Sequence, residues 1–405
     1  MSDPHRVPDH SPESPGDTRG LTRRRFLGAS VRTVAAAALF GATGTACGFG
    51  APSAERTNDR AGDERAAGDA AVEARWYERQ ADGSVLCTLC PHRCRIARGA
   101  RGPCRVRENR DGTLVTVAYG NPALIQADPV ERKPFFHVVP GSRALSVSTS
   151  GCPLECAFCE VWDVALVRPE EIHTHDAPPE AVVEQAKAIG ARSVSYAFGE
   201  PIAFSEYVLD TARIARANGL LNLVHTSGYI SDAPLAELLE TVDAVNVDLK
   251  AFDDAVYTRH VGGSLAPVLD TLRAVRAAGV HLEITNLVIP TVNDDRTSIA
   301  RMCRFIRTEL GADVPLHFAR FYPLYKLANL PPTPVSTLDA ARRIGREAGL
   351  EYVYVARVTG HDGENTYCPH CGRVAIRRLG FMIEEMNVSD GACASCHGPI
   401  RGIWA

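Results

Sequence analysis

The stretch GCPLECAFCE, residues 151–160, decides how this 405-residue sequence is interpreted. Cys152, Cys156 and Cys159 place three thiols within eight residues, and the next cysteine along the chain is Cys303. A structural zinc site closes with four ligands, and an iron–sulfur cubane normally takes four cysteines. Three cysteines therefore indicate a metal centre with one open position, where a substrate or cofactor can bind. The alternatives are a zinc site that borrows a distant ligand, or reduced cysteines in the core.

The overall composition is that of a globular protein rich in cysteine. Hydrophobic residues make up 45% of the chain and the net charge is −4, so no basic surface for a nucleic-acid partner is expected. Of the 13 cysteines, all but two fall in three groups, at 87–104, 152–159 and 368–396. Cysteines paired with two residues between them suit metal chelation better than a disulfide framework. We therefore interpret the three groups as metal sites.

The N-terminus carries features of an export signal. Residues 22–27, TRRRFL, resemble a twin-arginine signal, and the apolar run 34–46 is too short to span a bilayer as a free helix. Cys47 follows Gly-Thr-Ala, which resembles a lipoprotein processing site. These features predict a signal over 1–50, twin-arginine export and membrane attachment through a lipidated Cys47. The alternative is that the protein is cytoplasmic and that its basic N-terminus carries no targeting signal.

The middle of the chain alternates strand and helix patterns. Strands are expected at 144–149, 193–198, 220–225, 244–249, 281–289 and 315–321. Helices such as 205–218 and 264–278 lie between them and end at glycines. Such alternation predicts βαβ units and a parallel sheet, and six units predict an α/β fold with a partial (β/α)6 barrel.

This pattern also predicts the domain organisation. A charged, Ala- and Gly-rich linker is expected at 51–75, a Cys-rich N-terminal segment at 76–140 and the barrel at 141–358. A C-terminal module is expected at 359–405.

Polar and glycine-containing motifs follow the expected strands. The first strand runs into the cysteine loop, and the next three are followed by Gly199-Glu200-Pro201, by Thr226-Ser227-Gly228 and by Asp248-Leu249-Lys250. The carboxyl ends of barrel strands collect at one rim, so these motifs predict a shared ligand site. Asp248 and Lys250 alternate on one strand and face the same side, where a buried pair needs polar partners. The alternatives are ordinary strand-ending turns and a structural ion pair.

Two further cysteine sets flank the barrel. Four ligands spaced for zinc or for a second iron–sulfur cluster occur at Cys87, Cys90, Cys94 and Cys104. Two CxxC pairs resemble the knuckles of a zinc ribbon, at Cys368, Cys371, Cys393 and Cys396. Free or disulfide-bonded cysteines are the alternative for this last set.

Together these motifs resemble the radical S-adenosylmethionine (SAM) enzyme of the AmmeMemoRadiSam system, a relative of the glycyl-radical-enzyme activases. The resemblance covers residue 76 to the C-terminus. It rests on the cysteine loop and on CTLCPHRC at 87–94, GPC at 102–104, DLKAFD at 248–253, FYP at 321–323 and NTYCPHCG at 365–372.

The resemblance implies a 4Fe-4S cluster on Cys152, Cys156 and Cys159, with SAM on the open iron. One electron from a low-potential donor would cleave SAM to a 5′-deoxyadenosyl radical that abstracts hydrogen from an unidentified protein or small molecule. The implied SAM contacts are Gly199, Glu200 and Pro201 at the amino group, Asp248 and Lys250 at the ribose and carboxylate, and Phe158 near the adenine. Thr226 and Ser227 are expected to line the same ligand. Memo-like and AMMECR-type proteins are the implied partners.

The chain departs from this family at several positions. Glu160-Val161 follows the third cysteine where Gln-Asn is usual, and Ser227 stands where Asn is usual. An export signal is also unexpected, because SAM and low-potential donors are cytoplasmic. Two rival functions remain open: a non-catalytic multi-zinc interaction protein, and an exported binding protein with a degenerate barrel.

Overall fold

The structure is a computed structural model that describes residues 71–404. The predicted signal at 1–50, Cys47 and residues 51–70 of the predicted linker lie outside these residues. A short strand, β1 (Val72–Glu73), already pairs with β6 (Thr113–Thr116), so regular structure begins before the predicted end of the linker at 75. Across 71–404, no helix has both the length and the apolar character needed to cross a bilayer.

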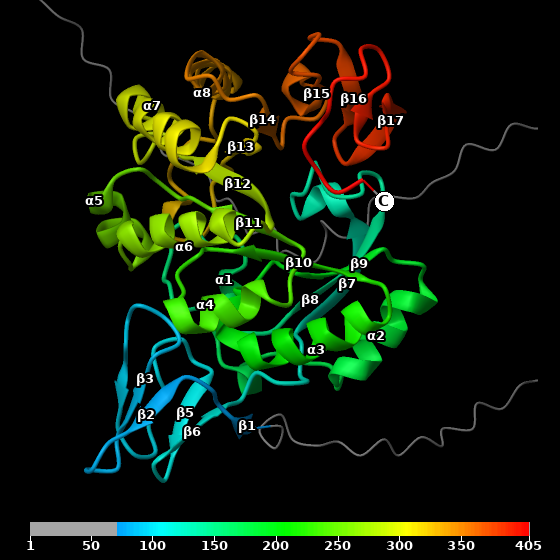
Figure 1. The fold of residues 1–405 in the computed structure, drawn as a ribbon. Helices are drawn as coiled ribbons and strands as arrows, with labels where there is room; N and C mark the ends of the chain where they lie inside the picture. The colour runs from blue at the N-terminus through cyan, green and yellow to red at the C-terminus, as the bar shows by residue number, and fades with distance from the viewer. Residues whose placement is uncertain (1–70, 405) are drawn as a thin grey trace, which may run out of the picture. The chain divides into compact units, whose positions relative to one another are not determined.

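The central element is an eight-stranded mixed sheet (Figure 1). Seven strands are parallel and lie in chain order, and an eighth, β7, is antiparallel at one edge. The strands are β7 (Leu124–Pro129), β8 (Arg143–Ser148), β9 (Ser193–Tyr196), β10 (Leu221–Thr226), β11 (Ala244–Asp248), β12 (His281–Val288), β13 (Leu316–Arg320) and β14 (Val353–Ala356). The order ends at β7 and β14, so the sheet is open rather than closed.

The predicted strands correspond to β8 through β13, and the parallel α/β architecture is confirmed. The six predicted strand–helix units are present, because each of β8 through β13 is followed by a helix. The sheet is larger than predicted, since β14 adds a seventh parallel strand and β7 adds an antiparallel one. Strand β14 is only four residues long, too short to show a clear alternation of its own. Strand β7 falls in the predicted N-terminal segment, so that segment contributes directly to the sheet.

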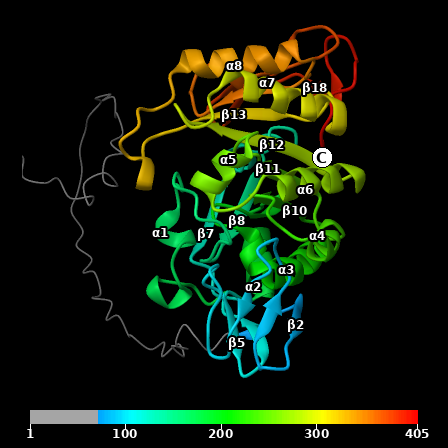
Figure 2. The same ribbon diagram turned by 90° about the vertical axis from the view of Figure 1, so that its left-hand side faces the viewer.

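Helices connect successive parallel strands, as the right-handed crossover of a βαβ unit requires (Figures 1 and 2). In the described part of the chain the longer ones are α2 (Pro179–Ala188), α3 (Ser205–Ala217), α4 (Asp232–Leu239), α6 (Ala266–Ala277), α7 (Arg296–Phe305) and α8 (Val335–Glu347). The predicted helices are confirmed as α3 and α6. Val268, Leu272 and Val275 of α6 form the buried stripe, and Gly279 ends the segment with φ 74°.

The N-terminal segment forms two small sheets. One contains β2 (Tyr77–Arg79), β3 (Val85–Cys87) and β4 (Arg95–Ile96), and the other contains β1, β6 and β5 (Arg107–Arg110). Val85 and Val106 are fully buried in the same hydrophobic cluster as the strands of the barrel. The segment therefore packs against the barrel as part of one core.

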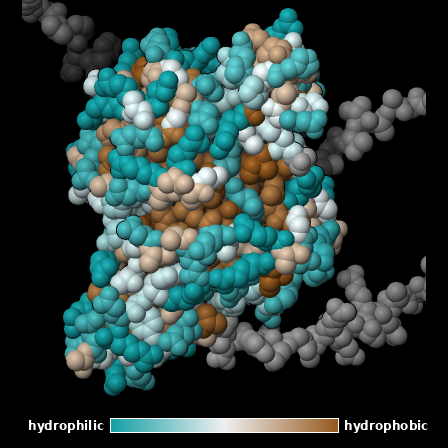
Figure 3. Space-filling model, in the orientation of Figure 1, coloured by the Kyte–Doolittle hydropathy of each residue, from teal (hydrophilic) through white to brown (hydrophobic). Residues whose placement is uncertain are grey.

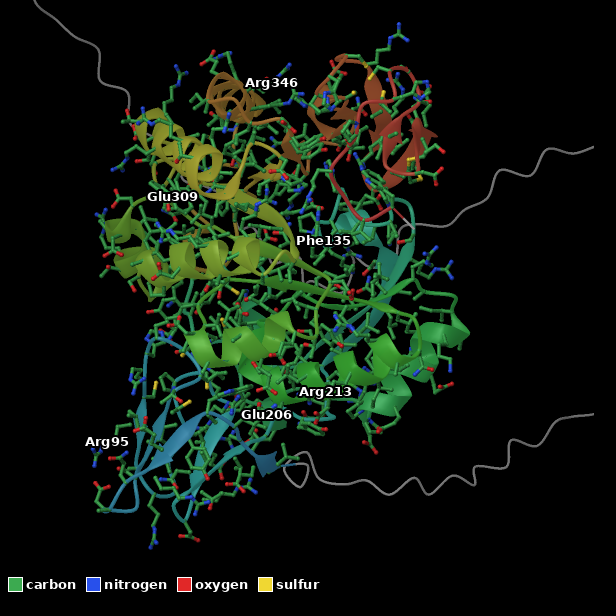
Figure 4. All side chains as sticks on the ribbon, in the orientation of Figure 1. Arg95, Phe135, Glu206, Arg213, Glu309 and Arg346 are labelled. Carbon is green, nitrogen blue, oxygen red and sulfur yellow. The ribbon has the colours of Figure 1, made fainter. Side chains whose placement is uncertain are left out.

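A buried ion pair joins this segment to helix α3. Arg107 donates from both terminal nitrogens to the two carboxylate oxygens of Glu206, each at 2.8 Å, and Glu206 also accepts from the backbone N–H of Arg75. The two side chains are 1% and 4% exposed. Figure 4 labels Glu206, which lies where the green helices meet the blue N-terminal strands.

The C-terminal residues form a small β module. It contains β15 (Thr366–Tyr367), β16 (Val374–Leu379) and β17 (Met382–Met386), with the pair β18 (Val388–Ser389) and β19 (Ala392–Cys393). Arg378 of β16 is buried and donates to the carbonyl of Phe136, 2.8 Å away, with its guanidinium over the Phe136 ring. The module thus rests on the loop between β7 and β8.

A buried carboxylate from strand β12 of the sheet binds the same loop. Glu283 of β12 accepts from the backbone N–H groups of Phe136 and His137 and from the Nε2 of His317, 2.6 Å away. Burial raises the pKa of Glu283, but hydrogen bonds from His281 and His317 outweigh this and hold the pKa well below its ordinary value. A charged Glu283 therefore fixes the loop that supports the C-terminal module.

We predict that Glu206→Ala destabilises the protein by about 3–5 kcal/mol, because it leaves the buried Arg107 charge without its partner. Glu184→Ala is the matched control, since Glu184 lies on the surface of α2 and pairs only with exposed Lys187. Thermal unfolding followed by circular dichroism should show a much lower midpoint for the first variant alone. Equal midpoints for the two variants would contradict this role of the ion pair.

Candidate active site and metal centres

A large cavity lies at the carboxyl ends of the strands. Its volume is about 720 Å³, and it is lined by the cysteine loop, by residues that follow β9, β10 and β11, and by Phe381 of the C-terminal module. Figure 3 shows brown apolar residues across the middle of one face, below the C-terminal strands. In parallel α/β folds this rim is where ligands bind.

The cysteine loop follows β8 directly and is fixed by main-chain hydrogen bonds. Glu155 and Ala157 donate their N–H groups to the carbonyls of Val261 and His260, in the π-helical turn after β11. Gly151 has φ 99°, and a Cβ there would lie 2.6 Å from Val106 Cγ1 and 3.0 Å from the carbonyl oxygen of Cys104. Only glycine fits this close approach between the loop and the N-terminal segment.

The three thiols of this loop suit an iron–sulfur cluster. Cys152, Cys156 and Cys159 all line the cavity and form no disulfide. The backbone N–H of Leu154 donates a hydrogen bond to Cys152 Sγ, 3.4 Å away. Sulfur ligands of iron–sulfur clusters accept hydrogen bonds of this kind. Burial raises the pKa of Cys156 to about 11, so a bound metal has to displace the thiol proton.

The Glu200 carboxylate binds several groups at the ends of β9 and β10 and so fixes this part of the cavity wall. Its Oε1 accepts from Thr226 Oγ1 at 2.6 Å and from the backbone N–H of Ile202, and its Oε2 accepts from the backbone N–H of Ser227 at 2.8 Å. The side chain is only 5% exposed. Each carboxylate oxygen has room for about two hydrogen bonds, so Oε2 retains an acceptor site. A cationic group entering the cavity can occupy it.

Gly199 brings this wall close to the cysteine loop. Its N–H donates to Ser148 Oγ, 2.9 Å away, at the end of β8. A Cβ on Gly199 would overlap Ser148 Oγ and lie 3.0 Å from the carbonyl oxygen of Thr149. The glycine is therefore required by close packing between neighbouring strand ends.

Three polar side chains meet at the ends of β10 and β11. Asp248 Oδ1 is 2.8 Å from His225 Nε2, and Asp248 Oδ2 is 3.1 Å from Lys250 Nζ. Burial raises the pKa of Asp248, but Lys250 and His225 outweigh it and hold that pKa well below its ordinary value. Burial lowers the pKa of Lys250, while Asp248 raises it well above normal. Both partners are therefore charged, and polar ligand groups can bind them.

The structure brings together almost all of the residues predicted for the ligand site. Those that line the cavity with the three cysteines are Phe158, Gly199, Glu200, Thr226, Ser227, Asp248 and Lys250. Pro201 does not line it; it begins the short 3-10 helix Pro201–Phe204 and is buried. The sequence did not identify His225 as part of the site, although its position beside Thr226 on one strand end was a usable signal.

Basic side chains that line the cavity were also missed by sequence reasoning. Lys133 is fully buried, pairs with Asp128 at 2.6 Å and lies 4.4 Å from the centre of the Phe198 ring. Burial lowers the pKa of Lys133 to about 8 even though Asp128 opposes this. Arg357, which follows β14, pairs with Glu160 across the cavity rim. These residues come from segments far apart in the sequence, so no local pattern connects them.

The C-terminal cysteines form a compact tetrad. The sulfur atoms of Cys368, Cys371, Cys393 and Cys396 lie within 4.8 Å of one another. Cys368 and Cys396 are 3.6 Å apart, and Cys371 and Cys393 are 3.9 Å apart. A zinc ion with tetrahedral Zn–S bonds of about 2.3 Å separates its sulfurs by about 3.8 Å. The tetrad is therefore compatible with a zinc-ribbon-like module.

The N-terminal cysteines line a second, mostly apolar cavity. Cys87 lies at the end of β3, Cys90 and Cys94 lie in the following turn, and Cys104 precedes β5. Pro153 of the cysteine loop forms part of the same wall. The predicted set is thus brought to one place, beside the main cavity.

Comparison with known proteins agrees with this geometry. The model of the radical SAM superfamily matches residues 146–303. The chain is 26% identical over 233 residues to the pyruvate formate-lyase 1-activating enzyme of Escherichia coli (strain K12), covering 53% of this chain and 93% of that enzyme. It is 32% identical over 166 residues to the isethionate sulfite-lyase activating enzyme of Nitratidesulfovibrio vulgaris, covering 39% of this chain and 54% of that enzyme. The chain therefore contains a radical SAM domain with relatives among the glycyl-radical activating enzymes.

A further relative extends over nearly all of the described chain. An uncharacterised protein of Methanocaldococcus jannaschii is 41% identical over 326 residues, which is 80% of this chain and 97% of that protein. The chain belongs to the same family as this archaeal protein.

We predict that the protein holds one zinc ion per chain in the C-terminal tetrad. Cys371→Ser should remove it, because a three-thiol site binds zinc more weakly. Cys303→Ser is the control, since Cys303 is buried in α7 away from all three cysteine sets. Zinc is measured by plasma mass spectrometry on anaerobically purified protein. Unchanged zinc in Cys371→Ser would exclude the tetrad as the site.

Proposed function

We propose that this protein is a radical SAM enzyme that abstracts hydrogen from another protein. The observation that carries the proposal is the convergence of Cys152, Cys156 and Cys159 with the strand-end motifs on one cavity. When bound, a 4Fe-4S cluster supplies one electron that cleaves SAM to methionine and a 5′-deoxyadenosyl radical, which takes hydrogen from the substrate. The protein's contribution is to bind and orient the cofactor and the substrate and to exclude water.

The residues of the cavity suit the groups of SAM. Glu200 lines the cavity, and the free acceptor site on its Oε2 suits the ammonium group. Asp248 accepts hydrogen bonds from hydroxyl groups of a ribose, while charged Lys250 is a partner for a carboxylate. The centre of the Phe158 ring lies 5.8 Å from Lys250 Nζ, and the ring offers an apolar surface for the adenine.

A protein substrate is favoured by the cavity and its surroundings. At about 720 Å³ the cavity leaves room beyond a SAM molecule, and it reaches Phe381 of the C-terminal module. Phe381 and Met382 are 44% and 62% exposed beside this opening. The relatives are named as enzymes that activate pyruvate formate-lyase and isethionate sulfite-lyase, and we transfer this kind of target, another protein, to the present chain.

The proposal includes the AmmeMemoRadiSam system as the cellular context. The motifs at 87–94, 248–253 and 365–372 support it. Its implied partners are a low-potential electron donor and Memo-like and AMMECR-type proteins. Export through the N-terminal signal, with lipid attachment at Cys47, is a separate proposal that rests on residues 1–50 alone.

We predict that the anaerobic, iron-loaded full chain converts SAM to 5′-deoxyadenosine when reduced with dithionite. Cys156→Ala should abolish the product, because a cluster ligand is lost, and Cys303→Ala should retain it. The product is measured by liquid chromatography and mass spectrometry. A folded, iron-loaded wild type that makes none, alone or with Memo-like and AMMECR-type proteins, would contradict the proposal. Colourless protein with zinc but no iron would favour the multi-zinc alternative.

We predict further that Glu200→Gln weakens SAM binding by about ten- to a hundredfold, because one charge-assisted hydrogen bond is worth about 1.5–3 kcal/mol. Glu180→Gln, on the exposed surface of α2, is the matched control. Equilibrium dialysis with the iron-loaded protein gives the dissociation constants, and iron content is measured on the same samples. Equal affinity of the two variants would remove Glu200 from the SAM site.

A further inference from the structure

A stacked aromatic pair lies beside the cysteine loop. Trp162 follows Cys159 by three residues, and its ring is stacked on that of Tyr325, with the ring centres 5.2 Å apart and the planes at 12°. The next residue, Lys326, donates its backbone N–H to the carbonyl of Ala157 in the loop, 3.1 Å away. Both rings are half-buried, and neither lines the main cavity. The pair therefore contacts the loop from outside the cavity.

Tyr325 is held there in a strained backbone conformation. Its φ of 53° lies in the left-handed region, which a bulky residue rarely adopts. The stacked Trp162 ring lies against it, and Lys326 Nζ lies 5.3 Å from the centre of its ring. Strained residues concentrate at sites of function, where the surrounding structure holds them in place. The strain at Tyr325 therefore marks this face as a candidate functional surface.

A chain of contacts extends this face toward the end of β13. The guanidinium groups of Arg320 and Arg357 each lie 5.3 Å from the centre of the Tyr322 ring, which is 42% exposed. Arg357 in turn pairs with Glu160, two residues before Trp162. The face is therefore continuous from Tyr322 to Trp162.

The charges of this face have a positive balance. Arg320, Arg357 and Lys326 oppose two acids, Glu160 and Asp163. Lys326 is exposed and forms no ion pair within residues 71–404. It differs in this respect from the other lysines of the chain, each of which pairs with a carboxylate: Lys133, Lys187 and Lys250. An acidic partner complements such a surface.

We propose that this face, formed by Trp162, Tyr322, Tyr325 and Lys326, binds the protein that donates the electron for SAM cleavage. The donor is a small acidic protein with a low-potential flavin or iron–sulfur centre. It loses one electron, and the metal centre on the cysteine loop gains it. The inference rests on the proposed function, because only a redox-active centre on the loop requires a donor.

The position of the face suits this partner better than the protein target. Cys159 is half-buried and close in sequence to Trp162, so a donor bound here lies next to a ligand of the metal centre. The target has to reach the cavity, which neither Trp162 nor Tyr325 lines. The cavity thus stays open to SAM and to the target while the donor is bound. A small aromatic surface also suits the weak, short-lived contacts of electron-transfer partners.

The first test measures binding of a bacterial flavodoxin, used as the probe, to the iron-loaded full chain at low salt. Lys326→Glu should weaken binding about fivefold, because it reverses a charge at the interface. Lys187→Glu on the surface of α2 is the matched control and should bind as the wild type does. Calorimetry gives the dissociation constants. Equal affinity of the two variants would overturn the inference, as would a wild type that binds neither flavodoxin nor a ferredoxin.

The second test separates docking from the SAM site. Cleavage of SAM driven by reduced flavodoxin should fall about fivefold in Lys326→Glu, as binding does, whereas cleavage driven by dithionite should match the wild type. Dithionite is a small ion that needs no protein docking surface. An equal fall with both reductants would overturn the inference. A wild type that cleaves no SAM with dithionite would instead contradict the proposed function, and the binding experiment would still decide the fate of this face.

Discussion

The parallel pairing of β8 through β11 is the constraint on which the active site depends. Each strand is in register with the next, so their carboxyl ends arrive at one edge of the sheet. This alone brings the cysteine loop, Glu200, Thr226 and Asp248 to one cavity, although they span about a hundred residues of sequence. Hydrogen bonds between the strand ends, such as Gly199 to Ser148 and Ser227 to Glu200, then hold the wall together.

Close packing around glycine links the site to the N-terminal segment. Gly151 allows the start of the cysteine loop to touch Val106 and Cys104, and the buried pair of Arg107 and Glu206 anchors the same segment to α3. The segment is thus held against the cluster loop by tight steric contact and by a desolvated ion pair. Either constraint makes the two cysteine sets neighbours, whatever metal each one binds.

The cysteine sets illustrate how sulfur spacing carries chemical information. The C-terminal sulfurs, 3.6 and 3.9 Å apart in two pairs, match the tetrahedron of a single ion. The thiols of the Cys152 loop instead line the cavity of about 720 Å³. The chain therefore carries a tetrad suited to a single structural ion and a three-thiol loop that lines an open cavity, and the presence of closely spaced cysteines in the sequence does not distinguish these geometries.

The sequence by itself determined the class of fold and most of the ligand site. Strand and helix periodicity located β8 through β13, and spacing identified the three cysteine sets, because both depend on local chain geometry. It did not predict β14, which is too short to show a pattern, or β7, whose place in the sheet depends on long-range pairing. Only the tertiary structure brought His225 to Asp248 and Lys133 to the cavity, and left Pro201 outside the cavity lining. The spacing between sulfurs was likewise a tertiary property, because it depends on how the turns fold and what packs against them.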